Sequence, residues 1–282
     1  MADFFQSVNS ALACCRFESK KAAIEKLSLW VNNGSRAPDD FTGFDAEVAQ
    51  RTSDPGRPSI PILVHPSEVP RRRLGSEAGR IGLIHAVAHI EFNAVNLALD
   101  AAYRFRGMPV DYYRDWIRVA GDEARHFEML VKRLHELGSD YGAMPAHGGM
   151  WEMAVATDYD VGVRMALVPR VLEARGLDVT PGMIKKLSQH GDHATVAILE
   201  QILFEEVDHV RIGNRWFKAV CQREELEPVA TFSQHLRKHG RIALRGPFNR
   251  EARLQAGFTE QELQELVELE LEFKQSFESE LA

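Results

Sequence analysis

Long apolar segments with helical spacing recur through the middle of the chain. Residues 79–105 are rich in Ala and Leu, and their apolar positions recur with helical and not alternating spacing. Gly107 ends this segment, and Pro109 opens a second helix that continues to about Leu137. The short connection predicts an antiparallel hairpin of two helices.

A second pair of helices is predicted further along the chain. Residues 151–175 form the first, and Pro169 is expected to kink it. After a loop containing Pro181 and a short helix at 183–189, a long helix is predicted at 192–221. The centre of the chain is therefore predicted to hold four long helices.

The two ends of the chain are predicted to add further helices and an irregular segment to the four central helices. An amphipathic helix is expected at 11–31, closing at Asn32-Asn33-Gly34, and six of the twelve prolines lie in 38–70, which should wrap over a surface as irregular chain. Near the other end, Thr259 and Glu262 have the spacing of a capping box that opens a final helix. We expect an all-α protein in three parts: 1–78, 79–222 and 223–282.

Charge and cysteine content narrow the classes of function. The net charge of −7 provides no overall positive field, so nucleic acid is not an expected partner. The three cysteines form no C-x-x-C pair, which argues against a disulfide framework and thiolate zinc. Neither a signal sequence nor 18 uninterrupted apolar residues are found, so a cytoplasmic protein without a membrane partner is expected.

Two of the predicted helices carry Glu-x-x-His. The pairs are Glu123 with His126 and Glu206 with His209. Residues three apart share a helix face, so each pair can bind one metal ion. A two-metal site needs two such pairs and further carboxylates that bridge the ions and neutralise their charge.

The neighbouring residues indicate which glutamates point inward. Glu91, Glu123 and Glu206 each interrupt an apolar stripe, and a buried glutamate requires a charge partner. Glu173 has a weaker stripe because Arg170 lies in it. Glu91 and Glu123 are 32 residues apart and Glu173 and Glu206 are 33 apart, as expected of two related hairpins.

Chance and surface exposure are the competing explanation. About one Glu-x-x-His is expected at random in a chain with this many histidines, so two of them are weak evidence alone. In that alternative these residues are solvated charges on helix surfaces. The repeated spacing and the apolar stripes favour the metal site.

These motifs resemble the ferritin-like superfamily of carboxylate di-metal proteins. The run Asp-Glu-Ala-Arg-His (122–126) is similar to the motif of bacterial multicomponent monooxygenases. Residues 81–217, with PAHGG (145–149), LEARGLD (172–178) and HVRIGNRWF (209–217), together with RGPFN (245–249), resemble a bacterial family of ferritin-like proteins of unknown function. Among characterised proteins, the sequence resembles the non-haem di-iron monooxygenase that hydroxylates a modified tRNA nucleoside.

The resemblance implies a ferritin-like four-helix bundle, with an added N-terminal helix and a C-terminal helical tail, that binds two iron ions. Mn–Fe and Mn–Mn are alternatives that the sequence does not separate. The resemblance implies Glu91 and Glu173 as terminal ligands, one for each metal. Glu123 and Glu206 would be the bridging carboxylates. His126 and His209 would supply one imidazole per metal. Asp122 and Glu205 would accept the histidine N–H of the opposite hairpin, with an exposed acid as the alternative for each.

Differences from other ferritin-like proteins limit which of their activities can be expected of this chain. Leu130 occupies the position of the tyrosine of ribonucleotide reductase-type enzymes, and Leu177 that of the threonine of hydrocarbon monooxygenases. Iron storage is disfavoured as a function because the iron-oxidising centre of ferritin has only one histidine on a Glu-x-x-His motif. The absence of C-x-x-C pairs argues against a classical rubrerythrin. His85 and His89 lie away from the Glu91 stripe, so packing or hydrogen bonding is expected of them.

Three hypotheses of function follow. The first is an oxidoreductase or hydroxylase that uses O₂ or peroxide and an external electron donor to oxidise a small molecule or a modified nucleoside. The second is a peroxide-reducing or metal-oxidising protein without an organic substrate. The third is a non-catalytic, metal-stabilised protein that binds a partner through the basic stretch 237–253, for which a solvated or salt-bridging loop is the alternative.

Overall fold

A computed structural model describes residues 4–32, 49–70, 73–240 and 244–281. Within them the backbone is helical or irregular, and the extended backbone pairs at one isolated bridge, Leu63 with Ala146. This confirms the all-α prediction. The chain divides into an N-terminal unit, residues 1–158 and 190–198, and a C-terminal unit, residues 159–189 and 199–282. The predicted parts 1–78, 79–222 and 223–282 stay a prediction.

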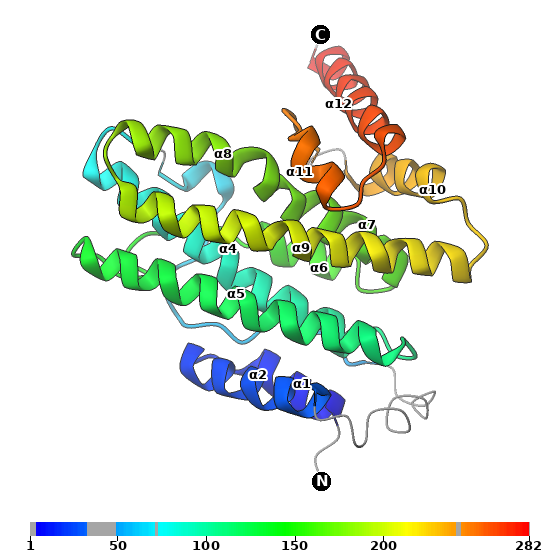
Figure 1. Cartoon of the computed structure of the whole chain (residues 1–282), viewed down its shortest axis with the longest axis horizontal. Coiled ribbons are helices and arrows are strands. Elements are labelled where there is room, and N and C mark those ends of the chain that lie inside the picture. The colour runs from blue at the N-terminus through cyan, green and yellow to red at the C-terminus, as the bar shows by residue number, and fades with distance from the viewer. Residues whose placement is uncertain (1–3, 33–48, 71–72, 241–243, 282) are drawn as a thin grey trace. The chain divides into compact units, whose positions relative to one another are not determined.

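The N-terminal unit is built around the antiparallel helices α4 and α5, which lie side by side (Figure 1). Ser76 caps α4 by accepting a hydrogen bond from the amide of Gly79, and the hairpin turns at Gly107, whose φ of +69° favours glycine. The helices of this unit are α1 (Phe4–Ala13), α2 (Phe17–Asn32), η1 (Pro66–Glu68), α4 (Glu77–Arg104), α5 (Val110–Glu136) and α6 (Gly149–Ala156).

The single helix predicted at 11–31 is wrong, because the chain forms α1 and α2 with a break between them. The buried ammonium of Lys20 explains the break: it donates to the carbonyls of Ala11 and Leu12 at 3.1 and 2.8 Å, which satisfies the end of α1. It also donates to Asn96 Oδ1 on α4 at 2.7 Å. Burial lowers the pKa of Lys20 to about 8. Gly34, the predicted helix end, lies outside the described residues.

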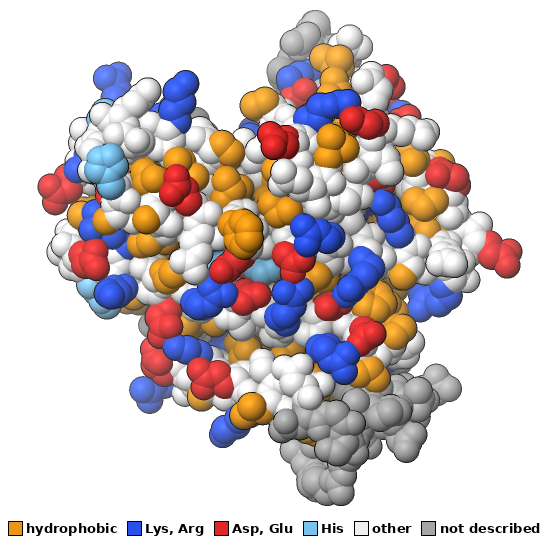
Figure 2. All heavy atoms as spheres, in the orientation of Figure 1, with side chains coloured by type: hydrophobic (Ala, Val, Ile, Leu, Met, Phe, Trp, Pro, Cys, Tyr) orange, Lys and Arg blue, Asp and Glu red, His pale blue; other side chains and the backbone are white. Residues whose placement is uncertain are grey.

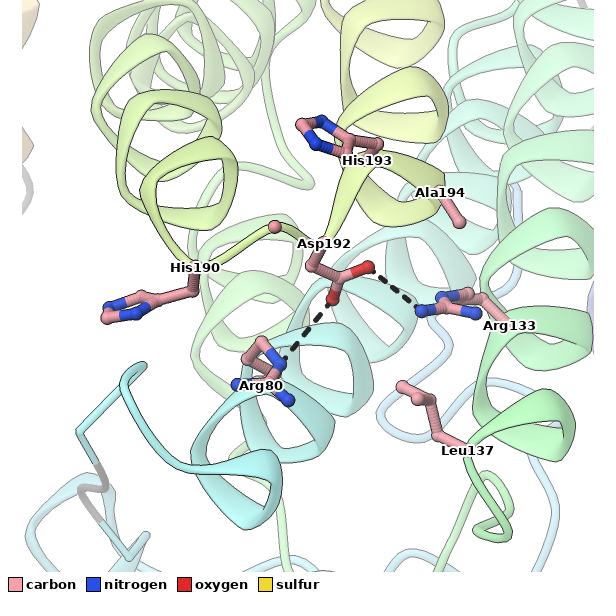
Figure 3. Close-up of a pocket in the computed structure, with 8 residues that line it drawn as sticks. Arg80, Arg133, Leu137, His190, Asp192, His193 and Ala194 are labelled. Atoms are coloured by element: carbon pink, nitrogen blue, oxygen red, sulfur yellow. Dashed lines mark hydrogen bonds and ion pairs between the residues drawn. The ribbon is translucent and has the colours of Figure 1, made fainter.

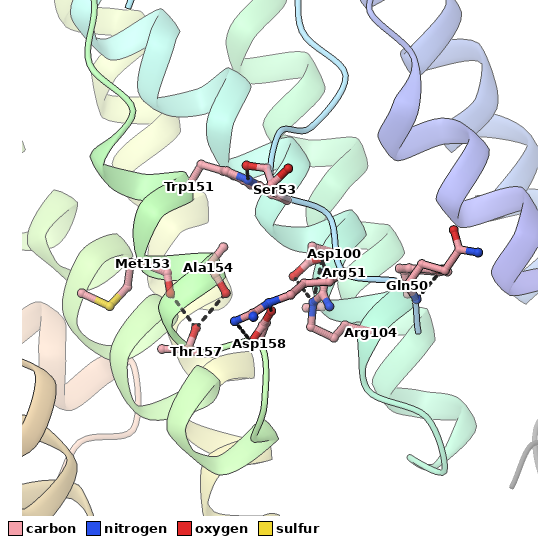
Figure 4. Close-up of polar contacts among 12 residues, drawn as sticks. Gln50, Arg51, Ser53, Asp100, Arg104, Trp151, Met153, Ala154, Thr157 and Asp158 are labelled. Carbon is pink, nitrogen blue, oxygen red and sulfur yellow. Dashed lines mark hydrogen bonds and ion pairs between the residues drawn. The ribbon is translucent and has the colours of Figure 1, made fainter. Parts of the chain in front are cut away.

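The described part of the proline-rich segment, 49–70, is irregular chain, as predicted, apart from the short helix η1 and the bridge at Leu63, while 38–48 lie outside the described residues. Side chains and backbone groups of this segment bond to α4 and to the region of α6 (Figure 4). The indole of Trp151 donates to the carbonyl of Ser53 at 3.1 Å, the amide of Gln50 donates to the Tyr103 hydroxyl at 3.1 Å, and Arg51 pairs with Asp158. These contacts hold the segment without a strand ladder.

In the C-terminal unit, the prediction of one helix at 151–175 is corrected. The helix breaks at 157–160, where Asp160 caps α7 by accepting from the amide of Val163 at 2.8 Å. The expected kink at Pro169 takes the form of a π-helical segment, since proline has no amide donor for an α-helical bond. Residues 183–189 belong to the end of a longer helix that contains Pro181.

The helices of this unit after the break are α7 (Val161–Leu167), η2 (Val168–Glu173), α8 (Ala174–Gln189), the later part of α9 (His193–Arg223), α10 (Pro228–His235), η3 (Leu236–Gly240), α11 (Arg250–Gln255) and α12 (Glu260–Leu281). The predicted capping box opens α12: the Thr259 amide donates to Glu262 Oε2 at 2.8 Å and the Glu262 amide donates to Thr259 Oγ1 at 3.1 Å.

A buried arginine joins α12 to η2. Arg170 is fully buried, pairs with Glu262, and lies 4.3, 3.8 and 4.9 Å from the ring centroids of Phe217, Phe232 and Phe258. The arginine that weakens the apolar stripe of Glu173 in the sequence is thus a core residue of this unit.

One described helix, α4, is long and apolar enough to cross a membrane by length and composition. Of its most apolar 18-residue window, 72% is buried in the structure. The core helix of a soluble protein passes the same test, so this is weak evidence for a membrane span. A cytoplasmic location stays a prediction.

Candidate metal centre

The N-terminal unit brings three of the predicted ligands together. Glu91 on α4 and Glu123 and His126 on α5 are 5%, 0% and 0% exposed. Nδ1 of His126 lies 3.3 Å from Oε2 of Glu91 and 3.3 Å from Oε2 of Glu123, and each residue offers a ligand atom within 4.8 Å of the others. We call these three residues the Glu91 cluster. The inward orientation predicted from the apolar stripes is correct for it.

Burial and neighbouring charges change the pKa values of two residues of this cluster when it is free of metal. Burial, and then the charge of Glu123, raises the pKa of Glu91. Burial opposes a charged His126, but hydrogen bonds to Glu123 and Glu91 outweigh it and raise the pKa of the imidazole. Two carboxylates and an imidazole are ligands that suit iron, manganese and zinc, and a metal ion would displace these protons. The buried group could therefore hold a metal ion.

The contribution of Glu91 to the stability of the metal-free chain is expected to fall as pH rises. The folded state keeps a proton on Glu91 above its ordinary pKa of 4.5, where the unfolded chain has lost it, so its contribution is lost with increasing pH. In urea titrations with a chelator, from about pH 5 to about pH 8, Glu91→Gln should show a shallower decline than the wild type. Equal slopes for the two proteins would contradict the assigned direction.

The C-terminal unit contains the other three predicted ligands, which we call the Glu173 group. Nδ1 of His209 lies 3.3 Å from Oε1 of Glu206, and the two residues are 1% and 8% exposed. Glu173 is the last residue of η2 and is 7% exposed. All three are therefore buried, and π-helical segments occur frequently at functional sites.

Two close approaches show how α7 and η2 run past α9 in this unit. A Cβ added to Gly213 would lie 2.3 Å from Cβ of Pro169, and one added to Gly162 would lie 3.3 Å from Cγ1 of Val220. The contacts are seven residues apart on both segments and run in opposite directions, so the pairing is antiparallel.

Asp122 and Glu205 are both half-buried. Asp122 Oδ1 accepts from Arg125 at 2.7 Å, and Glu205 Oε1 accepts from Gln201 at 3.4 Å. Both carboxylates thus accept a hydrogen bond from a residue of their own helix. Their predicted role as acceptors for the histidines of the opposite hairpins stays a prediction.

His85 and His89 pack and form hydrogen bonds, as predicted, and their partners include a residue that the sequence analysis missed. His85 Nε2 accepts from the amide of Gly142 at 2.9 Å, and His89 Nδ1 lies 2.8 Å from the hydroxyl of Tyr141. Tyr141 belongs to the loop after α5, where no periodicity marks a residue as facing the interior. The spacing of motifs therefore gives no signal for it.

A cavity of about 250 Å³ opens elsewhere in the N-terminal unit (Figure 3). In this cavity Oδ1 of Asp192 lies 2.9 Å from Nη2 of Arg133, and Oδ2 of Asp192 lies 3.7 Å from Nε of Arg80. Oδ1 of Asp192 also caps α9, because it accepts a hydrogen bond from the amide of Thr195 at 3.2 Å. Burial opposes the charge of Asp192, but hydrogen bonds from Thr195 and Arg133 outweigh it and lower its pKa. None of the predicted metal ligands lines this cavity.

The surface visible in Figure 2 mixes acidic and basic side chains. This agrees with the net charge of −7 and gives no large single-sign field on that face.

Comparison with known proteins identifies relatives without an assigned activity. The model of the family DUF455, described as a protein of unknown function, matches residues 13–264. An uncharacterized protein of Haemophilus influenzae (strain ATCC 51907 / DSM 11121 / KW20 / Rd) is 44% identical over 283 residues, which covers 97% of each chain. No solved structure matches.

Proposed function

Because this chain belongs to the DUF455 family, whose function is unknown, we propose its function from its own residues: a di-iron carboxylate protein that acts as an oxidoreductase with O₂ or peroxide. The observation that carries the proposal is the contact of His126 Nδ1 with Glu91 and Glu123 at 3.3 Å, inside a buried cluster. Two buried carboxylates beside one imidazole are costly in a protein core unless they bind a cation.

The second unit supports two metal ions over one. In each unit a Glu-x-x-His pair is buried on one helix, and each unit holds one further buried glutamate, Glu91 in the first and Glu173 in the second. The glutamate spacings of 32 and 33 residues repeat this relation in the sequence. We propose the six residues of the Glu91 cluster and the Glu173 group as the ligands of the two ions, as the resemblance of their sequence motifs to ferritin-like four-helix bundles implies. Their four carboxylates would balance the charge of two divalent ions.

Each residue would have the ligand role that its donor atoms suggest. Glu123 and Glu206 would bridge, Glu91 and Glu173 would bind one ion each, and His126 and His209 would supply one imidazole per ion. Iron bound there would supply the reduction of O₂ or peroxide. The protein contributes burial, which excludes bulk water, and the helix contacts that fix each ligand.

The test is metal analysis of the full chain expressed without added metal, followed by anomalous scattering at the iron and manganese edges. Two iron ions per chain at the six residues are expected, and the reduced protein should consume O₂ when mixed with it. Absence of bound metal after reconstitution with Fe(II) would contradict the proposal.

Product analysis then separates the remaining alternatives. Oxidation of an added small molecule or modified nucleoside supports the oxidoreductase. Rapid hydrogen peroxide turnover without an organic product would instead identify a peroxide-reducing protein, and bound metal without either activity would identify a structural one.

A further inference from the structure

The cavity of the N-terminal unit is lined by three separate parts of the chain. Arg80 comes from the start of α4, Arg133 and Leu137 come from the end of α5, and residues 190–194 lead into and begin α9. In Figure 3 the carboxylate of Asp192 lies between the two guanidinium groups. The cavity therefore has charged walls whose residues are brought together by the fold of this unit.

Asp192 and Arg133 form a fixed part of this wall. The side chain of Asp192 is 4% exposed, and it accepts hydrogen bonds from the Thr195 hydroxyl and from Nη2 of Arg133, each at 2.9 Å. Arg133 also donates from Nε to Thr195 Oγ1 at 3.0 Å and from Nη1 to Glu136 at 2.9 Å. Because these groups satisfy one another, they support the cavity and leave its binding capacity to other side chains.

Arg80 is the cationic side chain of the cavity that lacks a close acceptor among the described residues. Its side chain is 21% exposed, and its ion pair there joins Nε to Oδ2 of Asp192 at 3.7 Å, which is too long for a hydrogen bond. Arg104 of the same helix, by contrast, donates to Asp100 at 2.7 Å. A mostly buried guanidinium without a hydrogen-bonded acceptor is costly, and an anion bound in the cavity would remove that cost.

We propose that this cavity binds a phosphate group, either free inorganic phosphate or that of a small phosphate monoester, with Arg80 as its main ligand. Asp192 faces the Nε of Arg80, so the paired Nη groups are left for two phosphate oxygens. His190 and His193 also line the cavity and supply further N–H donors, and two arginines beside one carboxylate leave a net positive charge. The volume of about 250 Å³ is below the roughly 300–1,000 Å³ of sites for drug-sized ligands, which favours a small compound.

The first experiment measures binding of radiolabelled inorganic phosphate to the full chain by equilibrium dialysis, after a chelator has removed metal. Saturable binding is expected in the wild type. Arg80→Met should weaken it by at least about tenfold, because charge-assisted hydrogen bonds are lost. Arg80→Lys keeps the charge but not the paired donors, so it should weaken binding less. No saturable binding to the wild type, or equal binding to the wild type and both variants, would overturn the proposal.

Arg114→Met is the matched control, since it removes one positive charge from the same unit at a distance from the cavity. Arg114 is 40% exposed, pairs with Asp111, and lies about 28 Å along α5 from Arg133 by the rise of an α-helix. Phosphate binding should equal that of the wild type. A loss as large as that in Arg80→Met would show a general effect of net charge and would overturn the assignment of the site.

Competition for the labelled phosphate distinguishes the two sources of the group. Displacement by glycerol phosphate at a concentration equal to or below that of unlabelled phosphate would identify a phosphate monoester site, and weaker displacement would identify a site for inorganic phosphate. Displacement by acetate as effective as that by phosphate would overturn the choice of ligand. Because metal is absent throughout and none of the predicted metal ligands lines the cavity, these results are independent of the proposed metal centre.

Discussion

Glu123→Ala is expected to abolish iron binding in the Glu91 cluster. Glu123 is fully buried, its carboxylate lies 3.3 Å from His126 Nδ1, and it is the proposed bridging ligand of this unit. Its loss should lower metal affinity by more than the roughly 10–100-fold that removal of a group supporting a ligand costs. The measurement is iron per chain after Fe(II) reconstitution and desalting, with circular dichroism to establish that the helices remain.

Glu128→Ala is the matched control for this variant. Glu128 lies on the same helix, but its side chain is 48% exposed and pairs with Lys21 at the surface. It should bind iron as the wild type does. Equal iron content in Glu123→Ala and Glu128→Ala would remove Glu123 from the metal site.

Arg170→Met is expected to destabilise the protein by about 3–5 kcal/mol, because it leaves the buried carboxylate of Glu262 without its charge partner. Burial lowers the pKa of Arg170 to about 10, so the guanidinium is still charged at neutral pH. Burial opposes the charge of Glu262, but Arg170 outweighs it and lowers the pKa of the carboxyl. The free energy of unfolding in urea measures the loss.

Two further variants show whether the buried charge is the cause. Arg170→Met combined with Glu262→Leu removes both charges, and it should recover much of the lost stability. Arg250→Met breaks an ion pair with Glu260 whose side chains are 62% and 60% exposed, so the free energy of unfolding should hardly change. A loss in Arg170→Met no larger than in Arg250→Met would contradict this account.

The sequence predicts the hairpin of α4 and α5 to within two residues at each end. These helices are long and periodic, and the glycine and proline between them mark the turn locally. The break between α1 and α2 involves the buried Lys20, which donates to the carbonyls of Ala11 and Leu12, and sequence spacing does not reveal these contacts. The break before α7 was readable, since Asp160 is a favoured N-cap residue ahead of an apolar run.

In the candidate site, too, sequence patterns predict some residues and miss others. The apolar stripes around Glu91 and Glu123 predict their burial, because a regular helix repeats its inner face at known spacing. Glu173 ends a π-helical segment, where that spacing no longer holds, so its own stripe is a poor guide. Tyr141 comes from a loop, and no sequence pattern predicts its hydrogen bond to His89 or its ring contact with Phe127.

The division of the chain into two units has a consequence for how such a protein can be altered or inherited. The backbone passes from one unit to the other after residues 158, 189 and 198, and the third passage lies inside the continuous helix α9. Neither unit is a contiguous stretch of the gene, so no single cut yields an intact half. Expression of either unit alone as one uninterrupted segment would therefore omit part of that unit or include part of the other.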